Sequence, residues 1–297
     1  MSYLGIDVGG TKVAFRTENA AGIGEETESS FRWPRTRCVR DDLTALAEHT
    51  HALRSRLERP VEAVGVAMPA TLAPDGRVLT WPGRPFWEGV DLRAELAALL
   101  PGAEVRCADD GDLAALAEAD AADCGDLVYL GVGTGIGGGI VLDGRLVPGA
   151  HRGSCEVGHM VVDRRAGDLC DCGRRGCVQS VASGPATLRR AAELRGEPLE
   201  FTDLRDAFTA GERWAVDAVG ESCAALAAAA VSLAELVHPA RIVVGGGFAA
   251  GVPGFVETVA QEVTRLARPA WTPPPVHPAR LAGLSSLRGA LLLARRP

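Results

Sequence analysis

The sequence predicts an α/β protein of two lobes, and three observations lead to this prediction. The chain has 297 residues, which is enough for two domains. Short apolar runs typical of strands alternate with segments whose apolar residues recur at helical spacing. Two pairs of strand-like runs enclose glycine-rich turns, which suggests that one fold occurs twice. Two lobes make a cleft between them possible.

The first part of the chain resembles a hairpin followed by a crossover. Its patterns predict, in order, strands at 3–7 and 13–16, a helix at 41–57, a strand at 61–68, a helix at 91–100, a strand at 105–107 and a helix at 110–122. The first turn of the last helix carries acids. Asp109 and Asp110 therefore lie where a strand meets a helix.

The second part of the chain repeats the hairpin. We expect strands at 127–132 and 138–142 around the glycine turn 133–137, then helices at 184–194 and 210–237, a strand at 241–244 and a helix at 255–266. The Pro-rich stretch 269–278 is interpreted as a linker or an edge segment.

Composition excludes several classes of protein. Apolar residues make up 47% and charged residues 23%, and the net charge is −7, so neither disorder nor a nucleic-acid partner is indicated. An apolar strand begins at Tyr3 without a basic leader, and no stretch reaches the roughly 18 uncharged apolar residues of a membrane span. We expect a soluble cytoplasmic protein without a membrane partner. Its eight cysteines are then thiols or metal ligands, not disulfides.

The first glycine turn has the chemistry of a phosphate site. Asp7 ends a strand, two small residues follow at Gly9 and Gly10, and Thr11 and Lys12 add a hydroxyl and an ammonium group. Such a turn lets backbone N–H groups approach a phosphate while the acid holds a metal ion. Taken alone, such a turn is more often an ordinary tight hairpin.

The second glycine turn is harder to explain as an ordinary turn. Residues 131–139 contain six glycines, and each costs on the order of 0.5–1 kcal/mol relative to alanine inside regular structure. Neither turn fits the Walker or the dinucleotide pattern. With the glycines at 245–247 after a strand, the two turns suggest a nucleotide clamped between lobes. The alternative is a set of unusually glycine-rich turns.

A metal site is indicated by three cysteines and a histidine. Cys170, Cys172 and Cys177 are closely spaced, and His159 stands eleven residues before the first of them. Three thiolates and one imidazole form a tetrahedral zinc set, and four protein ligands leave no open position, so the zinc would be structural. The alternative is a fortuitous cluster of cysteines in a loop. The remaining cysteines are interpreted as ordinary small apolar residues: Cys38, Cys107, Cys124, Cys155 and Cys223.

These motifs together resemble the ROK group of bacterial sugar kinases and repressors, from residue 3 to about residue 294. The pairing of Glu-x-Gly-His at 156–159 with Cys-x-Cys-Gly-x-x-Gly-Cys at 170–177 is specific. The resemblance implies a two-lobed actin-like ATPase (hexokinase/ribonuclease H-like) fold with a zinc-binding loop. It implies ATP and Mg²⁺ as cofactors, transfer of the γ-phosphate to the 6-hydroxyl of a hexose, and a homodimer. We expect a small lobe from residues 1–109 and about 281–297, and a large lobe from 110–280.

The resemblance also implies roles for individual residues. Asp110 would be the general base, and Asp7 would organise magnesium. The cofactor-binding positions would be Asp7, Gly9, Gly10, Thr11, Lys12, Gly133, Thr134, Gly135, Gly246 and Gly247, the last two at the adenosine. Glu156 and His159 would meet the sugar hydroxyls at carbons 1 and 2, with His159 also a zinc ligand.

Several substrate-binding positions depart from the family pattern. Asp109 replaces an asparagine that binds the 3-hydroxyl of the sugar, and Gln179 replaces a glutamate just after the last cysteine. Two substrate loops also differ, with Pro69-Ala70 in place of Pro-Gly and Pro82-Gly83 in place of Pro-Asn.

The departure at Asp109 suggests the substrate. Two adjacent carboxylates repel each other, and the pKa of one or both rises unless a cation lies between them. An amino group at carbon 3 would supply that cation, which favours kanosamine (3-amino-3-deoxyglucose). A charge-assisted hydrogen bond is worth on the order of 1.5–3 kcal/mol, enough for a roughly ten- to hundredfold preference over glucose.

Three other functions stay open. The first is a glucokinase or another hexose or cyclitol kinase, since Asp109 could accept a hydrogen bond from a plain 3-hydroxyl. The second is a sugar-responsive regulator without kinase activity, but such repressors carry an N-terminal helix-turn-helix, whereas Asp7 stands six residues from the start. The third is a catalytically silent sugar-binding protein, which an ADP-release assay would distinguish.

Overall fold

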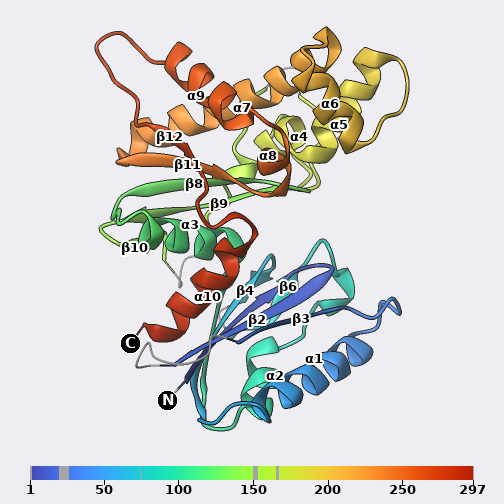
Figure 1. Ribbon diagram of the computed structural model, residues 1–297, viewed down its shortest axis with the longest axis vertical. Coiled ribbons are helices and arrows are strands. Elements are labelled where there is room, and N and C mark those ends of the chain that lie inside the picture. The colour runs from blue at the N-terminus through green and yellow to red at the C-terminus, as the bar shows by residue number, and fades with distance from the viewer. Residues whose placement is uncertain (1, 20–26, 74, 150–152, 165–166, 297) are drawn as a thin grey trace. The chain divides into compact units, whose positions relative to one another are not determined.

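The computed structural model describes residues 2–19, 27–73, 75–149, 153–164 and 167–296 (Figure 1). The chain divides into two compact units. Unit 1 consists of Met1–Ala117, Pro148–Ser154 and Leu284–Pro297, and unit 2 consists of Glu118–Val147 and Cys155–Gly283. Helix α3 (Asp110–Ala121) therefore begins in unit 1 and ends in unit 2.

Unit 1 is built on a five-stranded sheet with the order β3-β2-β1-β4-β7. The strands are β1 (Ser2–Val8), β2 (Lys12–Asn19), β3 (Thr27–Arg32), β4 (Val61–Met68) and β7 (Glu104–Asp109). The first three are antiparallel neighbours, whereas β4 and β7 run parallel to β1. The carboxyl ends of β1, β4 and β7 therefore meet at one edge of the sheet, where ligands bind in open α/β sheets.

Helices cover both faces of this sheet. Gly5 of β1 contacts α10 (Ser285–Arg295), where a Cβ atom would lie 2.8 Å from Leu291. The adjacent residues Leu4 and Ile6 belong instead to a core with Leu46 of α1 (Val39–Arg54) and with α2 (Leu92–Leu99). Because successive strand residues point to opposite faces, α10 covers one face and α1 and α2 the other (Figure 1). Between β4 and α2 the chain forms β5 (Thr71–Leu72), β6 (Val78–Thr80) and the short helix η1 (Pro85–Trp87).

Unit 2 contains a second sheet of the same design. Its order is β10-β9-β8-β11-β12, from β8 (Leu127–Val132), β9 (Ile136–Leu142), β10 (Arg145–Val147), β11 (Arg241–Gly245) and β12 (Val276–Pro278). As in unit 1, three strands form an antiparallel meander and two run parallel to its first strand. This repetition confirms the predicted duplication, and β12 shows that the Pro-rich stretch contributes an edge strand.

The core of unit 2 is formed around α7 (Arg213–Val237). Around it lie α4 (Val178–Ala182), α5 (Gly184–Arg195), α6 (Phe201–Thr209), α8 (Gly247–Gly251) and α9 (Phe255–Arg265), and the short helices η2 (Val157–His159) and η3 (Ala282–Leu284) complete the described elements. By length and mean hydropathy α7 could span a membrane. Its buried residues, among them Val219 and Leu226, instead lie in the core, as expected of a central helix in a globular unit.

Candidate active site and metal centre

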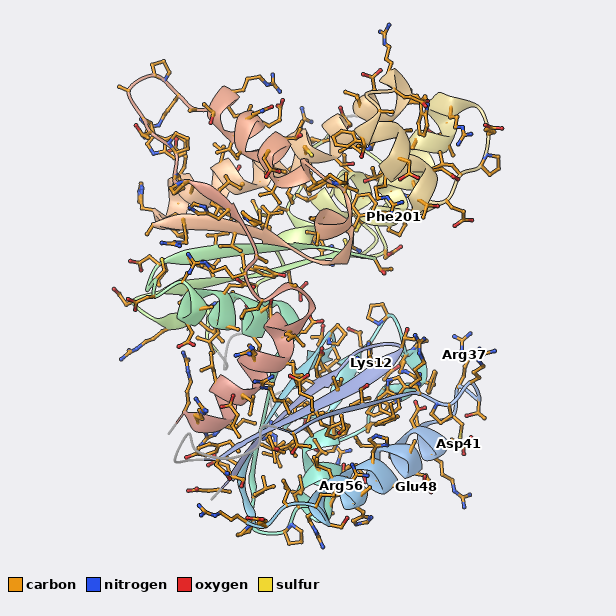
Figure 2. All side chains as sticks on the ribbon, in the orientation of Figure 1. Lys12, Arg37, Asp41, Glu48, Arg56 and Phe201 are labelled. Carbon is orange, nitrogen blue, oxygen red and sulfur yellow. The ribbon has the colours of Figure 1, made fainter. Side chains whose placement is uncertain are left out.

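The edge of the unit 1 sheet brings together the acids singled out in the sequence. In the sheet register, Asp7 of β1 lies opposite Ala67 of β4, and Met68 lies opposite Asp109 of β7. Burial, and next the nearby Asp110 carboxylate, raise the pKa of Asp7 to about 7, while Lys12 opposes this shift. Lys12 begins β2 and is exposed (Figure 2).

Asp109 is held in place as the cap of helix α3. Its Oδ1 accepts hydrogen bonds from the backbone N–H of Gly111 at 2.9 Å and of Asp112 at 3.3 Å, the arrangement of a helix N-cap. Burial first, then Asp110 and Asp112, raise the pKa of Asp109 to about 8 against these hydrogen bonds. Among the described residues, none hydrogen-bonds Oδ2. One oxygen therefore fixes the side chain and the other stays available to a ligand.

Asp110 is the first residue of α3, and its backbone carbonyl accepts a hydrogen bond from Ser286 Oγ of α10 at 3.2 Å. Its charge raises the pKa of both Asp7 and Asp109. A fourth acid, Asp112, lies in the same helical turn and is 7% exposed. Sequence reasoning missed Asp112, although an acid two positions after an acidic pair at a helix start was a usable signal.

Two segments assigned to different ligands meet beside these acids. The first glycine turn closes with a hydrogen bond from Gly9 N–H to the Lys12 carbonyl at 3.0 Å, and Gly10 and Thr11 are exposed. A Cβ atom on Gly83 would lie 3.7 Å from Gly10 Cα. The predicted substrate loop at Gly83 thus contacts the predicted phosphate turn. Pro69 and Ala70 directly follow β4, at the edge where β1 ends one residue after Asp7 and β7 ends at Asp109.

In unit 2 the two remaining glycine segments lie side by side. Gly133 N–H donates to the Gly135 carbonyl at 2.9 Å at the end of the β8–β9 hairpin. Gly246, just after β11, has a φ of 88°, and a Cβ there would lie 2.4 Å from the carbonyl oxygen of Val132. Only glycine permits this approach. Thr134 and Gly247 are exposed next to it, so the predicted nucleotide positions of this unit do form one group.

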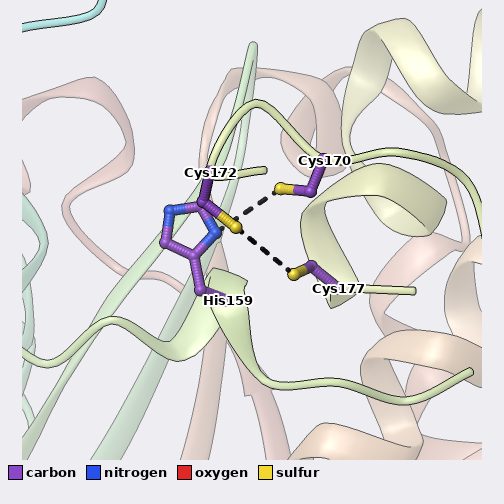
Figure 3. A group of neighbouring side chains, drawn as sticks. All are labelled: His159, Cys170, Cys172 and Cys177. Atoms are coloured by element: carbon purple, nitrogen blue, oxygen red, sulfur yellow. Dashed lines mark hydrogen bonds between the residues drawn. The ribbon is translucent and has the colours of Figure 1, made fainter. Parts of the chain in front are cut away.

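The predicted metal ligands also come together (Figure 3). The donor atoms of His159, Cys170, Cys172 and Cys177 all lie within 4.8 Å of one another. Cys170 Sγ is 3.6 Å from His159 Nδ1, and Cys172 Sγ is 3.6 Å from Cys177 Sγ. With Zn–S bonds of about 2.3 Å and Zn–N bonds of about 2.0 Å, the edges of a tetrahedral site are about 3.5–3.8 Å long. The four residues therefore fit a closed zinc site.

Local backbone geometry creates this cluster. Val161, two residues after His159, pairs with Cys177 in an antiparallel bridge. Gly176 has a φ of 73°, and a Cβ there would lie 1.7 Å from the carbonyl of Asp163. A hydrogen bond from the backbone N–H of Arg174 lowers the pKa of Cys172 to about 7, which favours the thiolate that zinc binds. Burial raises the pKa of Cys107 and of Cys223 to about 12, and also that of Cys177 in the cluster, so it is their distance from the cluster that sets Cys107 and Cys223 apart.

The other residues assigned to the sugar lie on either side of the metal cluster in the chain, with Glu156 before it and Gln179 after it. His159 Nε2, the ring nitrogen not facing Cys170, lies 4.0 Å from Oε2 of the exposed Glu156. Gln179, two residues after Cys177, accepts a hydrogen bond from the backbone N–H of Ile136 at 3.0 Å. The side-chain carbonyl oxygen of Gln179 therefore binds the backbone of the glycine hairpin. The sequence did not predict this contact. The same oxygen would lie 2.8 Å from a Cβ at Gly135.

The chain matches the ROK family over residues 3–297. Among known proteins it is 56% identical to the kanosamine kinase of Amycolatopsis mediterranei (strain S699), a match that covers 98% of this chain and 95% of that one. The ROK hexokinase of Thermus thermophilus has a TM-score of 0.86 at 30% identity, covering 99% of this chain and 98% of that chain. A ROK family glucokinase from Streptomyces griseus, solved with glucose and AMPPNP, has a TM-score of 0.79 at 26% identity and 100% coverage of both chains. These similarities confirm the predicted actin-like ATPase fold.

Replacing Asp109 by Asn is expected to stabilise the protein in a pH-dependent way. An acid with a raised pKa binds more protons folded than unfolded, so Asp109 lowers stability as pH rises from about 4 to about 8. Asn caps a helix as well as Asp does. The melting temperature of Asp109→Asn should therefore exceed that of the wild type more at pH 8 than at pH 5, by about 2–4 °C per kcal/mol of relieved repulsion.

A matched control is Asp91→Asn. Asp91 caps α2 by accepting from Ala94 N–H at 2.9 Å, and it is not among the charges that raise the pKa of Asp7 or of Asp109. It should show no such gain at pH 8. Equal pH dependence of both variants would contradict the charge repulsion inferred at Asp109.

Removal of one thiol should empty the metal centre. We expect about one zinc per chain in the purified protein by atomic absorption, and none in Cys172→Ser. Loss of a bound structural metal should lower the melting temperature by roughly 5–15 °C. Cys38→Ser, at an exposed cysteine outside the cluster, is the control and should retain both zinc and stability. A wild-type protein purified without zinc would refute the assignment.

Proposed function

Since this chain belongs to the ROK family, we propose that it phosphorylates the 6-hydroxyl of kanosamine with ATP, using Asp110 as general base. The chain is a sugar kinase of this family. The observation that carries the choice of substrate is the 56% identity to a kanosamine kinase over nearly the whole chain. The solved hexokinase and glucokinase are far less similar in sequence, at 30% and 26%.

Asp109 gives a physical reason for this choice. Its Oδ1 is used to cap α3, which leaves Oδ2 for a ligand. A bound cation would keep the carboxyl group ionised, and Oδ2 would then be a pure acceptor. An ammonium group at carbon 3 would donate to Oδ2 and would also offset the repulsion among the neighbouring acids. An asparagine would cap the helix equally well but would present an NH₂ donor, which suits a hydroxyl. The exchange therefore changes the chemistry of one ligand-facing atom and leaves the cap intact.

In the proposed reaction Asp110 accepts the proton of the 6-hydroxyl as that oxygen attacks the γ-phosphorus of ATP, and ADP leaves. The high pKa of Asp7, close to 7, indicates a site that favours a cation nearby. Mg²⁺ bound with ATP would neutralise phosphate charge there. The exposed turn at Gly10 and Thr11 would supply backbone N–H donors to the phosphates.

We assign the remaining roles to unit 2. By resemblance to the family, the hairpin from Gly133 to Gly135 would bind phosphate, and Gly246 and Gly247 would bind the adenosine. Glu156 and His159 would bind the hydroxyls at carbons 1 and 2. The zinc cluster would fix the position of His159, which is one of its ligands. It would also fix Gln179, because the ligand Cys177 directly precedes the helix that carries Gln179.

A hexose kinase without preference for an amine is the second candidate. It is favoured by the structural similarity to a glucokinase solved with glucose, and by the ability of a carboxylate to accept a hydrogen bond from a plain hydroxyl. The two candidates differ in what they predict for Asp109.

Substrate preference tests them directly. For wild type, kcat/KM should be roughly ten- to hundredfold higher with kanosamine than with glucose, because only the amine forms a charge-assisted hydrogen bond. Asp109→Asn should move this ratio toward glucose by at least about tenfold. Asp91→Asn makes the same exchange at the cap of another helix, α2, and should leave the ratio unchanged. A wild type that prefers glucose would exclude kanosamine as the substrate.

Replacing the proposed base gives a second test. Asp110→Asn should lower kcat by about 10²–10⁴-fold, because the amide cannot take up the hydroxyl proton, while kanosamine still binds. Affinity is measured by calorimetry and turnover by ADP release, and ³¹P–¹H correlation spectra of the wild-type product locate the phosphate. Turnover within about threefold of wild type, or phosphate on another carbon, would contradict the mechanism.

A further inference from the structure

Arg84 is a buried cation in the loop that carries Gly83. Only 7% of it is exposed, and it forms an ion pair with Asp42, which is fully buried. Trp87 Nε1 donates to the same carboxylate oxygen of Asp42 at 2.8 Å. The guanidinium Nε donates in another direction, to the carbonyl oxygen of Gly10 at 3.0 Å. A long side chain anchored in the core thus holds the backbone of the first glycine turn.

A second side chain holds the preceding carbonyl of the same turn. Trp33 Nε1 donates to the carbonyl oxygen of Gly9 at 2.8 Å. The two side chains support each other, because the guanidinium carbon of Arg84 lies 4.8 Å from the ring centroid of Trp33, within cation–π range. Two successive carbonyls of the glycine turn are therefore fixed by one buried assembly of Trp33, Asp42, Arg84 and Trp87.

Fixing these carbonyls also fixes the amide groups. In a planar trans peptide the C=O and N–H bonds point in opposite directions. With the Gly9 carbonyl held by Trp33, the N–H of Gly10 points away from the buried assembly. With the Gly10 carbonyl held by Arg84, the N–H of Thr11 does the same. Both residues are exposed, and among the described groups neither N–H has a hydrogen-bond acceptor.

The assembly is better explained by orientation than by stability. Burying a guanidinium and a carboxylate together is often no more favourable than burying apolar side chains of the same size. The other oxygen of Asp42, Oδ1, is buried and has no partner among the described residues. Glycine turns are conformationally free, so two free amides would not keep one direction without such support.

We propose that Arg84 and Trp33 are positioning residues that aim the N–H groups of Gly10 and Thr11 at the phosphates of ATP. This rests on the proposed function only in that the ligand of the turn is a nucleotide. Neither side chain touches the nucleotide in this role. Their effect passes through the two carbonyls, so it should appear in nucleotide affinity before it appears in anything else.

The test compares Arg84→Lys with Arg77→Lys. Lysine keeps a positive charge for Asp42 but lacks the planar fork that reaches Asp42 and Gly10 together. Arg77 also donates to a backbone carbonyl, that of Gly89 at 3.0 Å, but is exposed and away from the turn. Calorimetry with Mg²⁺ and AMPPNP should show affinity reduced at least about tenfold in Arg84→Lys and unchanged in Arg77→Lys.

A second variant, Trp33→Phe, tests the proposal independently in case Arg84→Lys does not fold. Trp33→Phe keeps an aromatic ring beside Arg84 and removes only the hydrogen bond to Gly9. It should lower AMPPNP affinity about fivefold or more, and in hydrogen exchange the protection that AMPPNP gives to residues 9–12 should weaken in both variants. A purely structural role would lower the melting temperature and leave affinity and protection unchanged.

The outcomes separate the two proposals. Affinities of Arg84→Lys and Trp33→Phe within twofold of Arg77→Lys would overturn the positioning role even if kanosamine is phosphorylated. Reduced AMPPNP affinity and reduced protection in both variants would support the positioning role. If the wild type then transfers phosphate to no amino sugar, only the proposed function would be overturned. A wild type that does not bind AMPPNP would overturn both.

Discussion

Crowding of carboxylates at the edge of the unit 1 sheet is the constraint on which the rest of the candidate site depends. Parallel pairing of β1, β4 and β7 forces Asp7 and Asp109 to end their strands at the same edge, with Asp110 adjoining. Burial in this position favours the neutral acids, and the neighbouring carboxylates favour them further. The site therefore suits positively charged partners. Lys12 meets this need at Asp7. Under the proposed function, a magnesium ion and a substrate ammonium would meet it at other places in the site.

The backbone of each glycine turn is held rigidly, and the two units use different contacts to hold it. In unit 1 the glycine turn is held by long side chains reaching from the core, through Arg84 and Trp33. In unit 2 the hairpin is held by Gln179, whose position follows from the metal cluster immediately before it. Glycine gives a turn the freedom to approach phosphate, and that same freedom has to be removed by contacts from outside the turn.

Under the proposed function, the helix cap at Asp109 would allow substrate choice to change without a change of fold. A capping side chain uses one oxygen for the helix and exposes its other terminal atom. Asp and Asn cap a helix equally well. They differ in the remaining terminal atom, which is an accepting oxygen in ionised Asp and a donating NH₂ group in Asn. Exchanging the two residues keeps the cap, but Asp adds charge repulsion that lowers the stability of the folded protein as pH rises. The requirement is that a cation replaces the lost donor.

The sequence by itself determined the features that depend on local pattern. Apolar runs located β4 and β8 at their observed bounds, and close spacing identified the metal ligands, since Cys170 to Cys177 form one loop. It did not reveal β3 and β10, whose side chains are polar or half exposed, nor α6 and α10. Tertiary structure alone decided the contacts between distant segments. Arg84 and Asp42 are 42 residues apart, and Gln179 and Ile136 are 43 apart. No periodicity records such pairs, because they arise only when packed elements bring their side chains together.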